Sequence, residues 1–272
     1  MKIKEKILNA MVWIYYRLMP DFIKKIIYKL FDYLVAGYRI KKAKISTKKH
    51  KDMYVFQDKK NNIRFEIASS ISKNDLHALI WYFQHYQPKK GDIVIDGWAF
   101  HGLISIYLAH LVGEEGKVFS FEPDPVNYKI LKENIQLNWL KNIIAINKWL
   151  WSHQDTLHFS RSGIDSSVFV NNKNKHDTID VEVVNPLEEI KKHGYDHIDF
   201  IKTDIEWAEI EMLRWLEPYM KKHPIQFAIA SYHIVPWEKY QTYRTLEALF
   251  TKAGYYSETQ RPWHLTTYAY RK

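Results

Sequence analysis

The stretch "GDIVIDGWAFHG", residues 91–102, joins an apolar run to an aspartate and then to a turn that contains glycine. Glycine in such a turn permits positive φ, lets the backbone approach a cofactor closely, and allows tight contact between helix and strand. A nucleotide-cofactor site begins in this way in many α/β proteins. We therefore expect a cofactor-binding turn made of Asp96, Gly97, Trp98, Ala99 and Gly102.

A second carboxylate follows at a spacing that is typical of ribose recognition. The next apolar run ends "FSFEPD", which places Glu122 twenty residues after Gly102. A carboxylate at this spacing can accept hydrogen bonds from both ribose hydroxyls of a nucleoside cofactor. The turn is not G-x-G-x-x-G and no Walker-type lysine follows it, which favours S-adenosylmethionine over a dinucleotide or a nucleoside triphosphate. The simpler alternative is a structural aspartate turn and an exposed glutamate.

Acidic residues and one histidine gather at two later strand ends. The stretch "IDFIKTDIEWAEIEML" places Asp204 at the end of a predicted strand, and "AIASYHI" places His233 at the end of the next one. We expect one of these two residues to act as a general base. Binding of a divalent cation that orients an acceptor is the alternative role for the pair. For Glu206 and Glu209, favourable charge in the first turn of a helix is the simpler explanation.

Strands and helices alternate along most of the chain, and this alternation determines where those side chains meet. Apolar runs predict strands near 92–96, 117–121, 142–147, 198–203 and 225–231, and helical patterns occur near 102–112, 125–137, 206–219 and 238–253. Such alternation predicts a mostly parallel sheet covered on both faces, with ligands beyond the carboxyl ends of the strands. Two final runs, at 255–259 and 264–271, predict strands that close the sheet antiparallel.

Three further segments surround this core. Residues 53–57 and 63–67 flank a polar turn and predict a hairpin, and a helix near 74–87 leads from it into the core. Residues 155–184 predict a short β insertion between the third and fourth main strands.

The charge of the chain is concentrated near its start. Residues 1–51 hold 14 Lys and Arg against 3 acidic residues, a balance of +11, so the net charge of +9 leaves −2 for residues 52–272. Apolar residues within 23–34 fall on one helical stripe, which predicts a basic amphipathic extension that packs on the domain or on a second subunit, or contacts a membrane surface. There is no cysteine, which favours a reducing compartment, so we expect a cytoplasmic protein, with membrane contact at the surface as the alternative.

These motifs resemble the FkbM-type methyltransferases, which are class I S-adenosylmethionine-dependent enzymes. The resemblance covers roughly residues 88–270 and also rests on "VFSFEPDPVNYKILKENIQLN" and "HLTTYAY". It implies a Rossmann-like sheet of seven strands, mostly parallel with an antiparallel last strand. It also implies S-adenosylmethionine as methyl donor and methylation of oxygen on a saccharide or secondary-metabolite acceptor. The expected domains are the extension 1–51, the hairpin and helix 52–87, and the methyltransferase domain 88–272.

Tryptophan stands where the family pattern has glycine. Trp98 replaces the first glycine of Asp-x-Gly-Ala-x-x-Gly, Trp207 the glycine of Asp-x-Glu-Gly-x-Glu, and Trp139 the glycine of Leu-Asn-Gly-Leu; Trp237 and Trp263 also lie in turn-like contexts. The chain has 9 glycines and 10 tryptophans, whereas typical usage predicts roughly 19 glycines. We therefore hypothesise that several of these tryptophans are UGA codons that the native organism reads as glycine.

Two other functions remain open. If the tryptophans are genuine, an indole at position 98 occupies space that the cofactor needs, and the chain is a degenerate, non-catalytic binding domain. A nucleic-acid methyltransferase is the less favoured alternative, since the body lacks a basic stripe and a motif for a flipped base.

Overall fold

The computed structural model describes residues 35–160, 167–168, 178–235, 240–260 and 265–271. Its centre is a seven-stranded sheet in the order β13-β14-β12-β11-β4-β5-β6. The strands are β4 (Ile93–Gly97), β5 (Lys117–Phe121), β6 (Ile143–Ile146), β11 (Phe200–Thr203), β12 (Gln226–Ala230), β13 (Tyr256–Gln260) and β14 (Thr266–Tyr270). Only β14 runs antiparallel to its neighbours in this sheet. The predicted sheet of class I methyltransferase type is confirmed.

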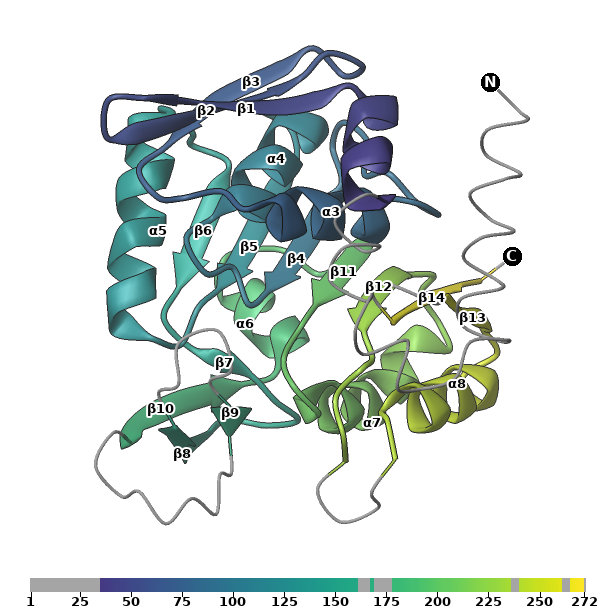
Figure 1. Ribbon diagram of the computed structural model, residues 1–272. Coiled ribbons are helices and arrows are strands. Elements are labelled where there is room, and N and C mark those ends of the chain that lie inside the picture. The colour runs from purple at the N-terminus through teal and green to yellow at the C-terminus, as the bar shows by residue number, and fades with distance from the viewer. Residues whose placement is uncertain (1–34, 161–166, 169–177, 236–239, 261–264, 272) are drawn as a thin grey trace, which may run out of the picture.

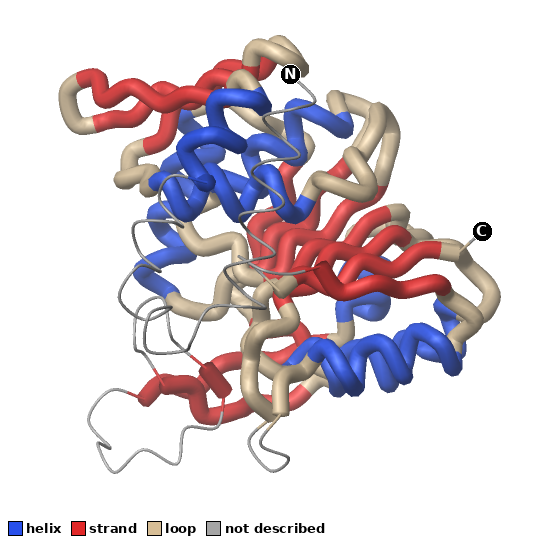
Figure 2. Tube along the Cα trace, turned by 45° about the vertical axis from the view of Figure 1, so that its right-hand side comes forward, coloured by secondary structure: helices blue, strands red, loops and turns tan. Residues whose placement is uncertain are grey.

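Helices cover both faces of this sheet because its central strands are apolar on both sides. On one face lie α3 (Lys73–Tyr82), α4 (Leu103–Val112) and α5 (Pro125–Leu137). On the other face lie α6 (Pro186–Lys192), α7 (Ala208–Met220) and α8 (Tyr243–Lys252). Figure 1 shows α7 and α8 together below the sheet, and Figure 2 shows the strands as a layer between the helices.

The strand order reverses between β4 and β11, and this reversal fixes the place of the site. The chain passes from β4 outward through β5 to β6, and then returns to β11 and β12 on the other side of β4. Ligands in such sheets bind beyond the carboxyl ends of the strands at this point. The turn after Gly97 and the residues after Thr203 therefore lie side by side, as the pairing of these two residues shows.

A three-stranded antiparallel sheet precedes the core. It consists of β1 (Ile45–His50), β2 (Met53–Asp58) and β3 (Ile63–Ile67), so the predicted hairpin of β2 and β3 is confirmed. Residues 45–50 correct the expectation of a helical extension up to residue 51. The helix over residues 35–43 ends at Lys44, whose φ of 60° reverses the chain, and Ile45 is then buried in the strand. The apolar stripe within 23–34 lies outside the described residues.

The predicted β insertion forms a separate four-stranded sheet in the order β7-β10-β8-β9. Its strands are β7 (Trp149–Leu150), β8 (Asp155–Ser160), β9 (Ser167–Val168) and β10 (Thr178–Val184). Helix α6 was not expected, although its start has two clear signals: Asn185 caps the first turn and Pro186 occupies the first helical position. In the described parts of the chain, no helix has the length and apolar character needed to cross a membrane.

Candidate active site

The turn after β4 is anchored by a buried ion pair. The Nζ of Lys202 lies 2.9 Å from the Oδ1 of Asp96, and the other oxygen of this carboxylate accepts a 2.6 Å hydrogen bond from Ser105. The same ammonium group donates to the carbonyl oxygens of Gly97 and Trp98, at 3.1 and 3.0 Å. Asp96 is fully buried, so its charge holds the turn in place through Lys202. Lys202 was not among the expected site residues, although a lysine in the apolar run "FIKTD" was a signal.

The turn itself has the conformation that glycine favours. Three of its residues have positive φ: 70° at Trp98, 49° at Phe100 and 93° at Gly102. The backbone N–H groups of Trp98 and Ala99 donate to the carbonyl oxygen of Phe121, at 3.1 and 2.9 Å. At Gly97 the constraint is space, since a Cβ would lie 2.8 Å from a methyl group of Leu150.

The tryptophans that replace family glycines fall into two groups. Trp98 and Trp139 have positive φ, of 70° and 55°, as glycine positions do. Trp139 follows the C-cap of α5, is 89% exposed, and donates its N–H to the carbonyl of Gln136, which is the Schellman position that glycine usually occupies. Trp207 instead has φ of −99° and is buried with its ring edge-on to Trp151. Trp237 and Trp263 lie outside the described residues.

Glu122, the predicted ribose ligand, is buried beneath the turn. Its Oε2 accepts the N–H of Phe100 at 2.8 Å and its Oε1 accepts the N–H of Asp124 at 3.0 Å. Burial raises the pKa of this carboxyl to about 7, although those two hydrogen bonds lower it. Glu122 does not line the cavity described next, so its role as ribose ligand stays a prediction.

A cavity of about 170 Å³ lies between the segment 67–82 and the turn after β4. It is lined by Ile67, Ser69, Ser70, Ile71, Asp75, Ala78, Tyr82, Trp98, Ala99, Phe100, His101, Leu103, Ile104, Lys202 and Asp204. Pockets for small molecules and cofactors usually measure about 300–1,000 Å³. The turn therefore fits a nucleoside cofactor in backbone conformation, whereas the cavity volume is smaller than such a cofactor needs. Trp98 is one of the lining residues, and its indole packs toward the opposite face of the sheet. Its ring lies edge-on to Trp149, with centroids 5.2 Å apart.

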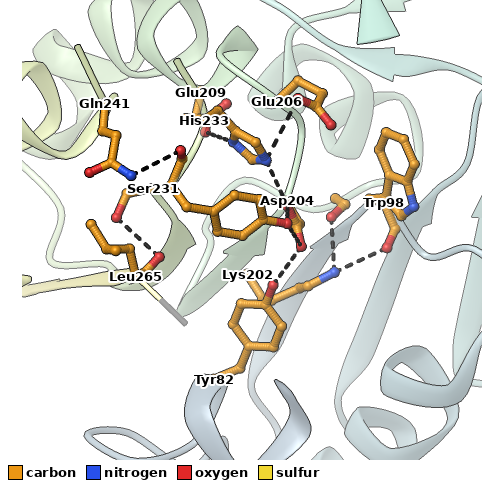
Figure 3. Close-up of polar contacts among 12 residues, drawn as sticks. Tyr82, Trp98, Lys202, Asp204, Glu206, Glu209, Ser231, His233, Gln241 and Leu265 are labelled. Carbon is orange, nitrogen blue, oxygen red and sulfur yellow. Dashed lines mark hydrogen bonds and ion pairs between the residues drawn. The ribbon is translucent and has the colours of Figure 1, made fainter. Parts of the chain in front are cut away.

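The carboxylate of Asp204 is the polar centre of the site. Its Oδ2 accepts the hydroxyl of Tyr82 at 2.9 Å, and its Oδ1 accepts the hydroxyl of Tyr232 at 2.9 Å. The Nε2 of His233 lies 3.1 Å from Oδ1 (Figure 3). Burial, together with the charge of Asp204, raises the pKa of both tyrosines, so their hydroxyl groups remain protonated donors.

His233 lies between two carboxylates. Its Nδ1 is 3.0 Å from the Oε1 of Glu209, opposite the contact of its Nε2 with Asp204. Burial alone lowers the pKa of His233. The charge of Glu209 and the contacts with both carboxylates outweigh this effect and raise the pKa well above its usual value. A protonated imidazole has no lone pair for a further proton. The arrangement therefore favours Asp204, which lines the cavity, over His233 as general base.

The expected cofactor turn and the two expected base candidates, Asp204 and His233, thus lie at neighbouring strand ends of the sheet. Within the described ranges, no group of three or more His, Cys, Asp or Glu side chains has an arrangement that could hold a metal ion. The divalent cation that the sequence left open has no support in these residues.

Two relatives show what the chain is similar to. The methyltransferase sdnD of Sordaria araneosa is 27% identical over 156 residues, which cover 46% of this chain and 60% of that protein. The chain thus matches less than two thirds of this relative's length. The crystal structure of the methyltransferase FkbM from Methylobacillus flagellatus matches with a TM-score of 0.51 at 16% identity, covering 75% of this chain and 56% of that one. At this identity, the likeness shows the fold alone.

A family model also matches the chain, over a longer stretch than the methyltransferase sdnD does. The model of the methyltransferase FkbM domain matches residues 99–256, which is more than half of the chain. This range includes Glu122, Asp204, Glu209 and His233, and it ends at the start of β13. The resemblance seen in the motifs is confirmed, and the chain belongs to the FkbM family of S-adenosylmethionine-dependent methyltransferases.

Proposed function

We propose that this protein transfers a methyl group from S-adenosylmethionine to a hydroxyl group of a saccharide or secondary-metabolite acceptor. Family membership supports methyl transfer. The observation that carries the choice of a hydroxyl acceptor is the position of Asp204, whose carboxylate lines the cavity beside the cofactor turn. A hydroxyl group must lose its proton during methylation, and a carboxylate at this place can accept it.

The residues of the site support this chemistry by orientation. A bound S-adenosylmethionine supplies an electrophilic methyl group on a sulfonium ion, and its transfer depends mainly on alignment and exclusion of water. As the acceptor oxygen bonds to the methyl carbon and the carbon–sulfur bond breaks, the hydroxyl proton passes to Asp204. Tyr82 and Tyr232 hold this carboxylate at the cavity through their hydroxyl groups.

On this proposal, the native residue at position 98 is glycine. A non-glycine residue at a φ of 70° costs about 1–2 kcal/mol, and with tryptophan at this position the cavity is smaller than cofactor pockets usually are. Trp139 supports the same explanation at a place remote from the cavity, because it also occupies a left-handed glycine position. The backbone of Trp207 gives no such support, since its φ is negative. Reading the codons at 98, 139 and 207 tests this directly: UGA supports glycine, and UGG in a standard code contradicts it.

Isothermal titration with S-adenosylmethionine tests the function. Three proteins are compared: the chain as written, Trp98→Gly, and Trp98→Ala as the matched control. Alanine removes the indole but keeps a Cβ in the left-handed conformation. We expect Trp98→Gly to bind at least tenfold more tightly than the chain as written. Trp98→Ala should bind with an affinity between those of the other two proteins.

Transfer is then measured with Trp98→Gly and S-adenosylmethionine labelled in the methyl group, against a panel of glycosides and hydroxylated small molecules. Asp204→Asn should abolish label incorporation while cofactor affinity stays within twofold. A folded Trp98→Gly protein that binds no cofactor would instead identify the chain as a degenerate, non-catalytic member. Incorporation into RNA or DNA alone would identify a nucleic-acid methyltransferase.

The basic segment 41–60 supports contact with an anionic membrane surface as an additional property of the protein. Eight lysines between the helix over residues 35–43 and the turn from β2 to β3 are exposed: Lys41, Lys42, Lys44, Lys48, Lys49, Lys51, Lys59 and Lys60. Lysines near an anionic leaflet each contribute about 1 kcal/mol. Co-sedimentation with phosphatidylserine vesicles should exceed that with phosphatidylcholine vesicles and decrease with salt; equal sedimentation with both would contradict membrane contact.

A further inference from the structure

Glu209 is a fully buried carboxylate in the first turn of α7. Charge at the start of a helix is favourable, yet a side chain placed for that purpose alone can remain in water. Burying a carboxylate costs several kcal/mol after relaxation, and an apolar side chain of similar size is often as stable or more so. Glu209 also does not line the cavity, so it does not touch an acceptor held there. Its burial needs a reason other than helix stability or contact with substrate.

The contacts of Glu209 lead to Asp204 through one side chain. The Oε1 of Glu209 is 3.0 Å from the Nδ1 of His233, and the Nε2 of the same ring is 3.1 Å from the Oδ1 of Asp204. Figure 3 shows the imidazole between the two carboxylates. The three residues come from different elements: Asp204 follows β11, Glu209 belongs to α7, and His233 follows β12. Only Asp204 reaches the cavity.

The direction of the His233 ring depends on Glu209. An imidazole ring that is turned about its Cβ–Cγ bond exchanges its nitrogens for carbons, and the contact with Asp204 is then lost. A carboxylate on Nδ1 fixes one orientation of the ring, because it must be met by an N–H group. The Oε2 of Glu209 has no hydrogen-bond partner among the described residues, so His233 is the side chain that this carboxylate serves.

We propose that Glu209 is a positioning residue, which acts through His233 to hold the Asp204 carboxylate in its orientation at the cavity. This inference rests on the proposed function of Asp204 as the base for an acceptor hydroxyl. Glu206 is the neighbouring acid with a weaker link, since its Oε2 is 3.8 Å from the Nε2 of His233. Glu209 would thus affect the reaction although it contacts neither the cofactor turn nor the cavity.

Nuclear magnetic resonance of the full chain, labelled with ¹⁵N-histidine and ¹³C-aspartate, tests this arrangement without an acceptor. The variant is Glu209→Gln, which keeps an oxygen for the Nδ1 hydrogen bond but removes the negative charge that favours a second proton on the ring, at the Nε2 that faces Asp204. Glu217→Gln, a change at a partly exposed acid of the same helix that does not contact His233, is the matched control. His233→Gln and Asp204→Asn assign the two signals, and circular dichroism checks that each variant is folded.

In the parent chain we expect His233 to carry protons on both ring nitrogens at pH 8. Glu209→Gln should remove that pattern and move the Asp204 carboxyl signal in the same direction as His233→Gln, whereas Glu217→Gln should move neither. A Glu209→Gln protein with an altered histidine and an unmoved Asp204 signal would overturn the proposal, since Glu209 would then serve packing alone. If Glu209→Gln does not fold, an unmoved Asp204 signal in His233→Gln contradicts it equally.

Titration with S-adenosylmethionine in the Trp98→Gly background separates this inference from the proposed function. Glu209→Gln should leave cofactor affinity within twofold and lower kcat at least tenfold on any hydroxyl acceptor found, with KM for the cofactor unchanged. Failure of Trp98→Gly itself to bind cofactor contradicts the proposed function and leaves the spectroscopic result on Glu209 standing.

Discussion

The ammonium group of Lys202 and the carboxylate of Asp96 lie 2.9 Å apart and are almost completely removed from solvent. They come from the two strands at the reversal of strand order, and Lys202 also binds two carbonyl oxygens of the turn. Because each charge is buried, each depends on the other to offset its loss of hydration. The pair thus joins β4 to β11 and holds the turn in place through the carbonyl oxygens of Gly97 and Trp98.

Replacing Lys202 by methionine should destabilise the fold strongly. The substitution keeps a similar length but leaves Asp96 buried without its cation, which typically costs about 3–5 kcal/mol. The free energy of unfolding in urea measures this cost. Lys252→Met is the control, because Lys252 forms an exposed ion pair with Glu217 at 2.9 Å and should lose no more than about 1 kcal/mol. Equal losses for the two variants would contradict a structural role for the buried pair.

Trp139→Gly should stabilise the protein. The residue has a φ of 55° and is 89% exposed, so the indole contributes little packing while its Cβ strains the end of α5. We expect a gain of about 1 kcal/mol, seen as a higher urea midpoint with an unchanged slope. Trp139→Ala removes the same indole but keeps the strain, so it should gain clearly less. Identical midpoints for glycine and alanine would show that the exposed indole, and not the backbone, determines the effect.

The sequence predicted the sheet because its strands are long apolar runs between well-marked helices. It did not predict β1, since "ISTKKH" buries only Ile45 and gains its order from pairing with β2. It placed Asp204 and His233 at the same edge of the sheet, because the carboxyl ends of parallel strands lie together. It could not show that Glu209 is buried against His233, because the charge of a first-turn residue gives no information on which way the helix faces. Lys202 was missed for a similar reason, as its partner is 106 residues away.

The stability of the protein should decrease as pH rises from about 4.5 to about 7, in part because of Glu122. Burial raises the pKa of this carboxyl to about 7, above the value of about 4.5 for an exposed carboxyl. Between these two values the folded state binds more protons than the unfolded state, so folding loses up to about 1.4 kcal/mol per pH unit. Above about pH 7 the contribution is constant.

Urea unfolding of the parent and of Glu122→Gln at several pH values from 4.5 to 8 isolates this group. Glutamine does not titrate, so the difference between the two proteins should change across this range and then level off. Glu209 also has a raised pKa, and comparing the two proteins at each pH cancels its contribution. A constant difference from pH 4.5 to 8 would mean that Glu122 titrates alike in the folded and unfolded states.

Gly102→Ala should be more damaging than Gly91→Ala, although both glycines have similar backbone conformations. Their φ values are 93° and 88°, so a Cβ at either position meets the same backbone strain of about 1–2 kcal/mol. At Gly102 the added Cβ would also lie 2.7 Å from the Cδ1 of Leu131, a fully buried residue of α5, whereas nothing lies within 4 Å at Gly91. Overpacking of this kind adds about 1–3 kcal/mol. Urea unfolding of both variants measures the difference, and equal destabilisation would show that α5 moves away freely, so that the turn and α5 are not tightly packed.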